Sequence, residues 1–240
     1  MNIILFSPSE VELPLPGRDP RARHIAEVLR REPGDTFAVG LINGPRGQAT
    51  LRAVTAEGLV LSYEWGATPP PPLAPIRLLV GLPRPQTARD ILRECAALGV
   101  AAMDFVRTAR TDPGYGRSSL WASPEWENLL LAGAAQACCT RIPTVQHGRS
   151  LDETLRDLPA DSTRVALDNY EAPEALSRLD LANRPAAVLA LGAERGWSPA
   201  ERDLLRAHGF AFAHLGERVL RTETACIAAI TLLKAKFGLL

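Results

Sequence analysis

The second half of the chain alternates short apolar runs with polar and amphipathic stretches. The apolar runs span Ile76–Leu82, Ala101–Ala109, Arg164–Asp168, Ala186–Leu191 and Phe210–Leu215. Runs of this length, bounded by turn residues, predict buried strands. Alternation of such strands with helices is typical of a mostly parallel sheet with helices on both faces. The pattern therefore predicts an α/β fold for this half.

Polar residues mark where the intervening helices begin. Ser198-Pro199-Ala200-Glu201 combines a capping serine, a proline at the first helical position and a glutamate that completes a capping box, in a helix that stops at Gly209. We expect related starts at Thr87 with Asp90, at Ser123-Pro124 and at Ser150 with Glu153. The helix opened by Thr87 is expected to end near Gly99, and Thr224–Phe237 is predicted to form the last helix.

The first part of the chain is mostly β-structure by the same criteria. Strand-like segments cover Met1–Phe6, Thr36–Ile42, Gln48–Thr55 and Leu59–Trp65, with turn residues between them. Arg21–Arg30 has the apolar spacing of a short amphipathic helix. A small β-barrel with one helix accounts for these elements.

A proline run separates the two parts. Residues 69–75 read Pro-Pro-Pro-Pro-Leu-Ala-Pro, a composition that favours polyproline II and acts as a stiff spacer. We therefore predict two domains, residues 1–68 and 76–240, joined by a linker at 69–75.

Composition narrows the class of protein. The 240 residues are 46% hydrophobic, which is typical of a globular protein, and the longest apolar runs are far too short for a membrane span. The four cysteines form no C-x-x-C pair and the four histidines have no ligand spacing, so we expect no structural zinc. No basic region opens the chain as in a signal peptide, and a reduced, cytoplasmic protein is expected.

The charge balance gives two opposing indications about nucleic acid. A net charge of zero argues against a strongly basic nucleic-acid binder. Only Lys234 and Lys236 are lysines, however, which leaves 25 of the 27 basic residues as arginine. A coding bias explains this excess, and so does the suitability of arginine for phosphate and base contacts. Local clusters, at residues 18–31 and 84–117, are therefore more informative than the total.

Two loops with glycine follow predicted strands of the second domain. They are Leu191–Ser198 and Leu215–Ala225, and the latter packs Arg218, Arg221 and Glu223 into six residues. Ligands gather at the carboxyl ends of strands in open α/β sheets, so two such loops favour a small-molecule pocket over two ordinary turns. The phosphate-binding motifs G-x-x-x-x-G-K-[ST] and G-x-G-x-x-G and the hydrolase motif G-x-S-x-G are absent.

These loops also carry a family resemblance. Leu215–Ala225 matches the pattern LG-x-R-[VI]-L-R-T-E-T-A of the RsmE family of 16S ribosomal RNA methyltransferases, in the SPOUT superfamily. Leu191–Ser198 stands at the place of the family's Gly-Pro-Glu-Gly-Gly loop, with weaker matches at residues 94–100 (E-L-G-V) and 24–35 (H-x-x-x-V-L-R-x-x-x-G-D). The resemblance therefore covers the whole chain.

The resemblance implies a fold and an activity. The N-terminal domain would be a PUA-like RNA-binding β-barrel, and the C-terminal domain a SPOUT fold with a deep trefoil knot that binds S-adenosylmethionine. The protein would act as a homodimer, without a metal or a membrane, and would methylate N3 of a uridine in small-subunit ribosomal RNA.

It also implies roles for individual residues. Cofactor contacts are expected at Leu191, Gly192, Gly196, Leu215, Gly216, Val219 and Leu220. Arg221 or Arg218 would offset the negative charge of the deprotonated base, which is worth about 3 kcal/mol for one well-placed donor. Glu223 is the candidate proton acceptor, and a surface ion pair with Arg221 is its alternative role. RNA contacts are expected at Arg21, Arg23, His24, Arg30 and Arg31.

Four positions depart from the family motifs. Ala193 and Arg195 alter the glycine loop, Thr87 stands where a lysine is frequent, and Cys139 stands where an arginine is usual. Arginine at position 195 would be strained if that position required positive φ, and it would obstruct a cofactor held by the backbone there. Such differences leave two alternatives open: a non-catalytic RNA-binding or ribosome-assembly protein of the same fold, and a SPOUT methyltransferase with another RNA target.

Overall fold

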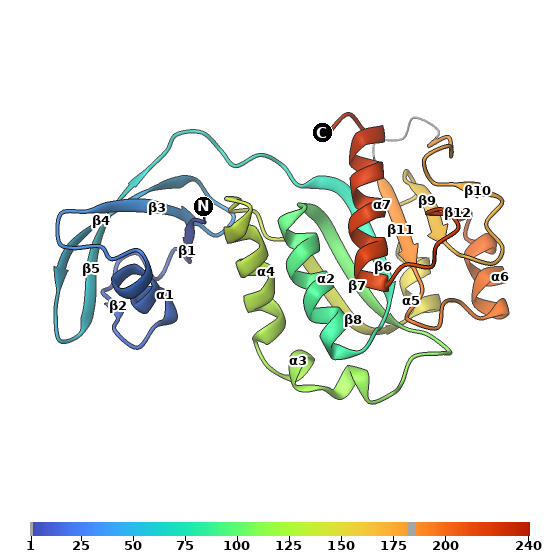
Figure 1. Ribbon diagram of the computed structural model, residues 1–240, viewed down its shortest axis with the longest axis horizontal. Helices are drawn as coiled ribbons and strands as arrows, with labels where there is room; N and C mark the ends of the chain where they lie inside the picture. Colours follow the sequence, from blue (N-terminus) through green and yellow to red (C-terminus); the bar gives the residue numbers. More distant parts are fainter. Residues whose placement is uncertain (1, 182–185) are drawn as a thin grey trace. The chain divides into compact units, whose positions relative to one another are not determined.

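The computed structural model describes residues 2–181 and 186–240 and separates into two compact units (Figure 1). The first unit combines Met1–Pro72 with Leu131–Ile142, and the second combines Leu73–Leu130 with Pro143–Leu240. The change of unit after Pro72 falls inside the proline-rich segment 69–75. The return at Leu131 has no signal in the sequence pattern, because it lies inside a continuous helix.

A five-stranded mixed sheet forms the first unit. Its order is β1-β3-β4-β5-β2, in which β1 pairs parallel with β3 and the other neighbours are antiparallel. The strands are β1 (Ile4–Phe6), β2 (Leu15–Pro16), β3 (Thr36–Leu41), β4 (Arg46–Val54) and β5 (Gly58–Trp65). The four predicted segments correspond to β1, β3, β4 and β5, but β4 begins two residues and β5 one residue earlier than predicted. The short strand β2 was not predicted, and Met1 lies outside the described residues. In the described residues β1 and β2 are the sheet edges, which is the pairing of an open sheet.

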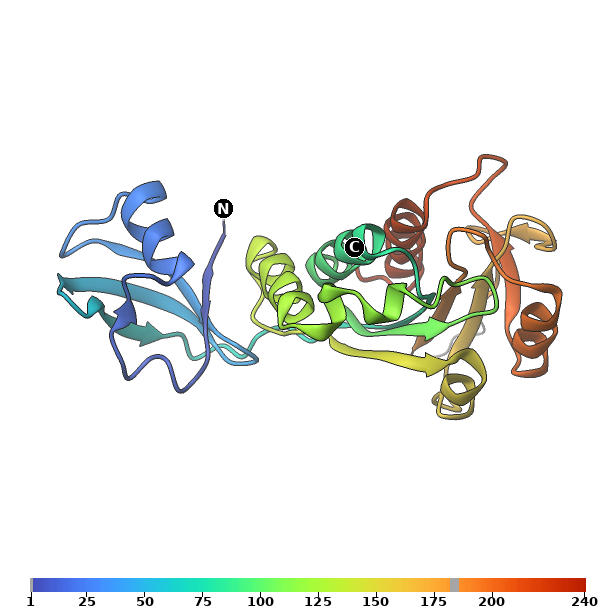
Figure 2. The same ribbon diagram turned by 90° about the horizontal axis from the view of Figure 1, so that it is seen from below.

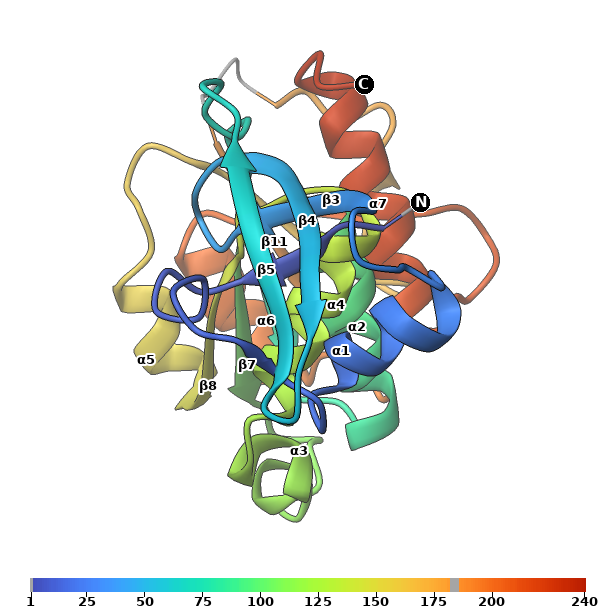
Figure 3. The same ribbon diagram turned by 90° about the vertical axis from the view of Figure 1, so that its left-hand side faces the viewer.

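The predicted helix Arg21–Arg30 is wrong in its bounds. It begins earlier, as α1 (Pro20–Arg23), because Asp19 caps it and proline occupies its first turn, and it continues as a π-helical turn, η1 (His24–Val28). Figure 3 shows the ribbon of α1 beside the strands of this sheet. Buried Ala22 of α1 and Ile25 of η1 form one apolar cluster with side chains of the sheet. This cluster is the core of the first unit.

Seven parallel strands form the sheet of the second unit, in the order β10-β12-β9-β11-β6-β7-β8. The strands are β6 (Ala74–Gly81), β7 (Val100–Arg107), β8 (Thr144–Ser150), β9 (Thr163–Leu167), β10 (Glu174–Ala175), β11 (Ala187–Leu191) and β12 (Ala211–His214). The predicted α/β fold with a mostly parallel sheet is confirmed. The edge strands β8 and β10 escaped prediction, because edge positions do not require a continuous apolar run.

Helices cover both faces of this sheet. Figure 2 shows α2 and α7 on one face, where they contact each other, and α5 and α6 on the other. The helices are α2 (Pro85–Ala97), α3 (Ser119–Ala122), α4 (Glu125–Gln136), α5 (Leu151–Arg156), α6 (Pro199–Ala207) and α7 (Thr222–Lys236), with a 3₁₀ turn η2 (Tyr115–Arg117). Leu155 of α5 and Leu205 of α6 pack with Val188 and Ala190 of β11, so the sheet lies in the core.

The helix starts test the capping signals. Ser150 and Ser198 form the predicted capping boxes with Glu153 and Glu201. The predicted start at Thr87 is wrong, because Pro85 opens α2 two residues earlier. The Thr87 hydroxyl instead accepts a hydrogen bond from the Nε of Arg84 at 3.2 Å.

Candidate functional site

Parallel strands β9, β11 and β12 are neighbours, so the loops that follow them meet at one edge of the sheet. These loops enclose a cavity of about 170 Å³. Its lining comes from residues 167–170 and 191–196 and from His214, Leu215, Arg218, Val219, Leu220, Thr222 and Ala225. It is called the knot-side cavity below, after the knot that the family resemblance predicts. Three separate strand ends thus build one site.

The loop after β11 lines the cavity with its backbone. A Cβ atom on Gly192 would lie 2.7 Å from the Cα of Gly196, and one on Gly81 of β6 would lie 2.6 Å from the nitrogen of Ala193. Neither position has room for a side chain, so the loop folds back on itself and rests on the end of β6. Gly196 also adopts a φ of +62°, which favours glycine.

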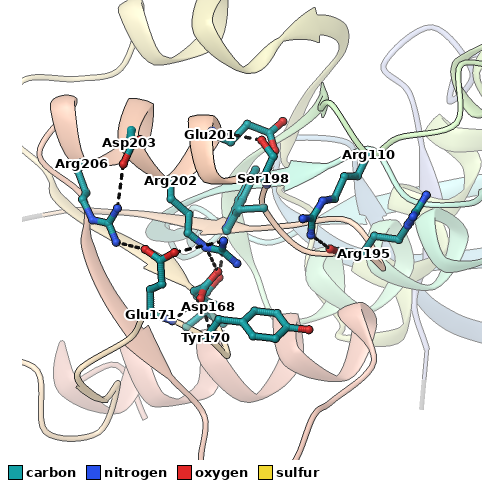
Figure 4. Close-up of polar contacts among 12 residues, drawn as sticks. Arg110, Asp168, Tyr170, Glu171, Arg195, Ser198, Glu201, Arg202, Asp203 and Arg206 are labelled. Carbon is teal, nitrogen blue, oxygen red and sulfur yellow. Dashed lines mark hydrogen bonds and ion pairs between the residues drawn. The ribbon is translucent and has the colours of Figure 1, made fainter.

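Arg195 leaves this cavity open. Among the described residues other than glycine, only Arg30, Asn43 and Cys138 have positive φ, so the backbone at Arg195 carries no such strain. Its side chain is exposed, and its carbonyl oxygen accepts a hydrogen bond from the Nη1 of Arg110 at 2.6 Å (Figure 4). The departure from the glycine motif is therefore compatible with an accessible site.

Asp168 fixes the loop after β9. One carboxylate oxygen accepts hydrogen bonds from the backbone nitrogens of Tyr170 and Glu171, both at 2.7 Å, and the other accepts one from the Nε of Arg202 at 2.8 Å (Figure 4). The side chains of Asp168 and Arg202 are only 2% and 7% exposed. Because a buried charge without its partner is strongly destabilising, this pair holds the loop against the cavity.

The loop after β12 contributes the third wall. Gly216 has a φ of +108°, and its nitrogen donates to the Nδ1 of His214 at 3.0 Å, which makes a tight turn at the strand end. The chain then passes Val219 and Leu220 and enters α7, whose first turn closes the cavity with Thr222. No side-chain hydrogen bond of Arg221, the residue before the helix, caps this start.

Most residues predicted to contact a cofactor surround this cavity. They are Leu191, Gly192, Gly196, Leu215, Val219 and Leu220. Gly216 is not part of the lining in the described residues and instead shapes the turn. A cofactor role for these residues remains a prediction.

The three predicted catalytic residues are not grouped. Arg218 is exposed and lines the cavity. In the described part of the chain, neither Arg221 nor Glu223 lines it; Arg221 is exposed and Glu223 is half-buried in the first turn of α7. Within one chain, only Arg218 is placed to act directly in the cavity.

Sequence reasoning missed the wall after β9. Asp168, Asn169 and Tyr170 line the cavity, as do His214 and Thr222. The rule that found the other two loops also applies to the predicted strand Arg164–Asp168, since it is parallel to them. The loop that follows this strand contains no glycine, so the glycine criterion did not identify it.

The predicted RNA-binding residues lie together in the first unit, in and after α1 and η1. Arg23, Arg30 and Arg31 are exposed and His24 is half-buried. Arg21 differs, because its guanidinium donates to the carboxylates of Glu10 and Asp19 and to the carbonyl of Leu5. The hydrogen bond from Arg21 lowers the pKa of Glu10 to about 2. Arg21 thus serves the structure of its own unit.

The described residues contain neither a membrane-spanning helix nor a cluster of metal ligands. No helix there is long and apolar enough to cross a membrane. No group of three or more histidine, cysteine, aspartate or glutamate side chains in residues 2–181 and 186–240 has a metal-binding arrangement.

Comparison with known proteins decides the family. A family model described as an RNA methyltransferase domain matches residues 69–234. A Treponema pallidum protein, ribosomal RNA small subunit methyltransferase E, is 34% identical over 98% of this chain and 91% of its own length. The chain belongs to this family. A Borreliella burgdorferi member, ribosomal RNA small subunit methyltransferase E 1, is 26% identical over 98% of both chains.

Solved structures show the same fold. A putative methyltransferase from Legionella pneumophila, in complex with bound S-adenosylmethionine, has a TM-score of 0.78, 23% identity and 98% coverage of both chains. Ribosomal RNA small subunit methyltransferase E from Neisseria gonorrhoeae, bound to S-adenosylmethionine, has a TM-score of 0.75 at the same identity and coverage. These two similarities show that the fold is shared along nearly the whole chain.

Proposed function

We propose that this protein is an S-adenosylmethionine-dependent methyltransferase that acts on small-subunit ribosomal RNA, at N3 of a uridine. The observation that carries the proposal is family membership over the full length combined with an open knot-side cavity. We expect the enzyme to work in the cytoplasm, where its RNA substrate is made.

The cavity suits S-adenosylmethionine. This cofactor carries no phosphate, so backbone groups and apolar side chains are adequate partners. Leu191, Leu215 and Leu220 offer apolar walls, and the close backbone contact between Gly192 and Gly196, which leaves no room for a Cβ, fixes the loop that lines the cavity. When bound, the cofactor would supply an activated methyl group.

The acceptor chemistry requires removal of a proton from uridine N3. The base must first leave its stack and pairing to become accessible. Arg218, which lines the cavity, would stabilise the negative charge on the base. The proposal keeps Glu223 as the proton acceptor and Arg221 as a second cation. Both lie outside the cavity lining of their own chain, so to act on the base they would need a site completed by a partner subunit.

We propose that the protein is a homodimer that uses α7. Its sequence is apolar on nearly all sides, and such helices are normally covered on all sides. Ile227 of this helix is nevertheless 37% exposed, and Val219 just before it is 79% exposed. A second copy of the chain would cover both.

The finer architecture also belongs to this proposal. We expect a deep trefoil knot in the second unit, supported by the way residues 214–220 share one cavity with the earlier loops after β9 and β11. We expect the first unit to be a PUA-like RNA-docking domain, with contacts from Arg23, His24, Arg30 and Arg31. Arg21 is left out, since its donors are engaged within the unit.

Nucleoside mass spectrometry would test the proposal. Small subunits from a strain that lacks this gene should lack one 3-methyluridine, and the purified protein with isotopically labelled S-adenosylmethionine should restore it. Persistence of 3-methyluridine in the deletion strain would contradict the N3 assignment. Absence of cofactor binding in calorimetry at millimolar ligand would instead favour the non-catalytic RNA-binding alternative.

A further inference from the structure

A second cavity lies beside the knot-side cavity, at the ends of β6, β7 and β11. Its volume is about 470 Å³. β6 is the neighbour of both β7 and β11, so the three loops that follow these strands meet there. Glu194 and Arg195 line both cavities and therefore form a shared wall. We call the second space the arginine cavity.

Hydrogen bonds between the three loops hold this space open. The carboxylate of Glu201 accepts from the nitrogens of Ala109 and Ser198, both at 2.7 Å, which ties the loop after β7 to the loop after β11. Arg110 makes a second tie through its bond to the carbonyl of Arg195 (Figure 4). Glu194 makes a third, since its Oε1 accepts from the nitrogen of Arg84 at 2.9 Å. The cavity is a built feature of the fold.

Its walls carry positive charge. Arg84, Arg110 and Arg195 all line it, and in residues 2–181 and 186–240 no carboxylate forms an ion pair with Arg110 or Arg195. Two carboxylates lie in the lining as well: Asp112 accepts from the nitrogen of Gly114, and Glu194 is 3.8 Å from the Nε of Arg84. Three cations against two anions leave a cationic surface, which suits a phosphate group.

An aromatic ring completes the lining. Tyr115, in η2, is half-buried on the wall of the arginine cavity. Aromatic rings beside arginines are the usual means by which proteins hold single-stranded nucleic acid, with the base stacked and the backbone paired. A bare anion would contact only the arginines, and an apolar ligand would contact only the tyrosine ring.

We propose that the arginine cavity holds the unstacked acceptor nucleotide of single-stranded RNA, with its base on Tyr115 and its phosphates on Arg84 and Arg110. This rests on the proposed methyl transfer, because the shared wall at Glu194 and Arg195 would bring the base next to the methyl donor. Arg195, where the family motif has a glycine, then adds a cation at that boundary in this particular chain.

Two binding measurements on the full-length protein would test this. The probes are a fluorescein-labelled oligouridylate and S-adenosylmethionine, applied to the wild type, Arg84→Ala/Arg110→Ala, Tyr115→Ala and a charge control, Arg156→Ala, whose surface ion pair lies on α5. We expect the double variant to bind the oligonucleotide at least tenfold more weakly, with a salt slope lower by about 0.7 for each phosphate contact removed. Tyr115→Ala should weaken binding without changing the slope. Cofactor affinity should stay within twofold throughout.

The outcomes separate this inference from the proposed function. Oligonucleotide affinity within twofold of wild type in the double variant, or no binding by the wild type, would overturn the cavity assignment even if methyl transfer occurs. If the variants lose oligonucleotide binding but the wild type methylates no RNA, the assignment of the cavity as an RNA site stands and the proposed methyltransferase function is rejected. If a variant does not fold, photocrosslinking of wild type to 4-thiouridine oligonucleotide should label residues 109–117 or 194–195; labels elsewhere would contradict the proposal.

Discussion

The two cavities at the carboxyl edge of the large sheet share one loop but differ in what faces the ligand. The lining of the knot-side cavity includes four leucines and two glycines beside Glu194, Arg195 and Arg218, and its nearest buried charges, Asp168 and Arg202, are paired with each other. The arginine cavity presents three guanidinium groups and a tyrosine ring. The first cavity therefore offers apolar side chains and glycine backbone in addition to charge, which suits a phosphate-free donor, whereas the second offers mainly charge and an aromatic ring, which suits a phosphate-linked acceptor.

The largest expected effect comes from breaking the buried ion pair on the knot side. Arg202→Met leaves Asp168 buried without a partner, which should lower the free energy of unfolding by about 3–5 kcal/mol. Urea unfolding measures this. Arg206→Met is the matched control, because its ion pairs are exposed and worth at most about 1 kcal/mol. Equal losses in the two variants would show that Asp168 does not anchor the loop.

Filling the glycine contact should damage the knot-side cavity alone. In Gly192→Ala the new methyl group meets the backbone of Gly196, and overpacking of this kind costs about 2 kcal/mol, or roughly thirtyfold in cofactor affinity. Calorimetry with S-adenosylmethionine tests this, with Gly17→Ala as a control because its Cβ would meet nothing within 4 Å. Oligonucleotide affinity should stay unchanged, and a parallel loss of both ligands would mean that the cavities are not separate.

Salt should distinguish the two cavities in the wild-type protein. Raising the salt from about 50 to 200 mM should weaken oligonucleotide binding by roughly twentyfold, if about three phosphates are contacted, because the release of counterions on binding becomes less favourable. Cofactor affinity, which rests on backbone and apolar contacts, should change less than twofold. Titrations at four salt concentrations would measure both, and parallel slopes would refute the contrast.

The ion pair between Arg21 and Glu10 in the first unit should make the stability of the protein depend on pH in the acid range. The folded-state pKa of Glu10 is lowered to about 2 from 4.5 by Arg21, so the folded protein binds fewer protons than the unfolded chain in this range. The stabilisation is therefore complete above about pH 4.5 and is lost as the pH falls towards 2. In Glu10→Gln, the free energy of unfolding should depend slightly less on pH in this range. An unchanged acid profile by circular dichroism would contradict the ion pair.

The sequence predicted the parts of the site that depend on local pattern. The apolar runs located the central strands, and Gly192 and Leu220 lie on the cavity that their loops were expected to build. Asp168 was missed because its role depends on Arg202, 34 positions later in the chain. The contacts of Arg21 could not be predicted for a similar reason, since only the folded chain brings Glu10 to it. Pairings between distant residues have no periodicity to detect.

Leu131–Ile142 belongs to the first unit although the segments on either side of it belong to the second, and this has a consequence for how the chain is made. The nitrogen of Ile3 donates to the carbonyl of Ala135, and Ile3 and Leu5 pack with Ala134. A ribosome therefore delivers the start of the first unit well before the helix that completes it, with β6, α2 and β7 synthesised in between. The early strands must wait for residues 131–142, and a fragment that ends at residue 72 would expose the apolar surface of Ile3 and Leu5. The first unit is first in sequence but late to be completed.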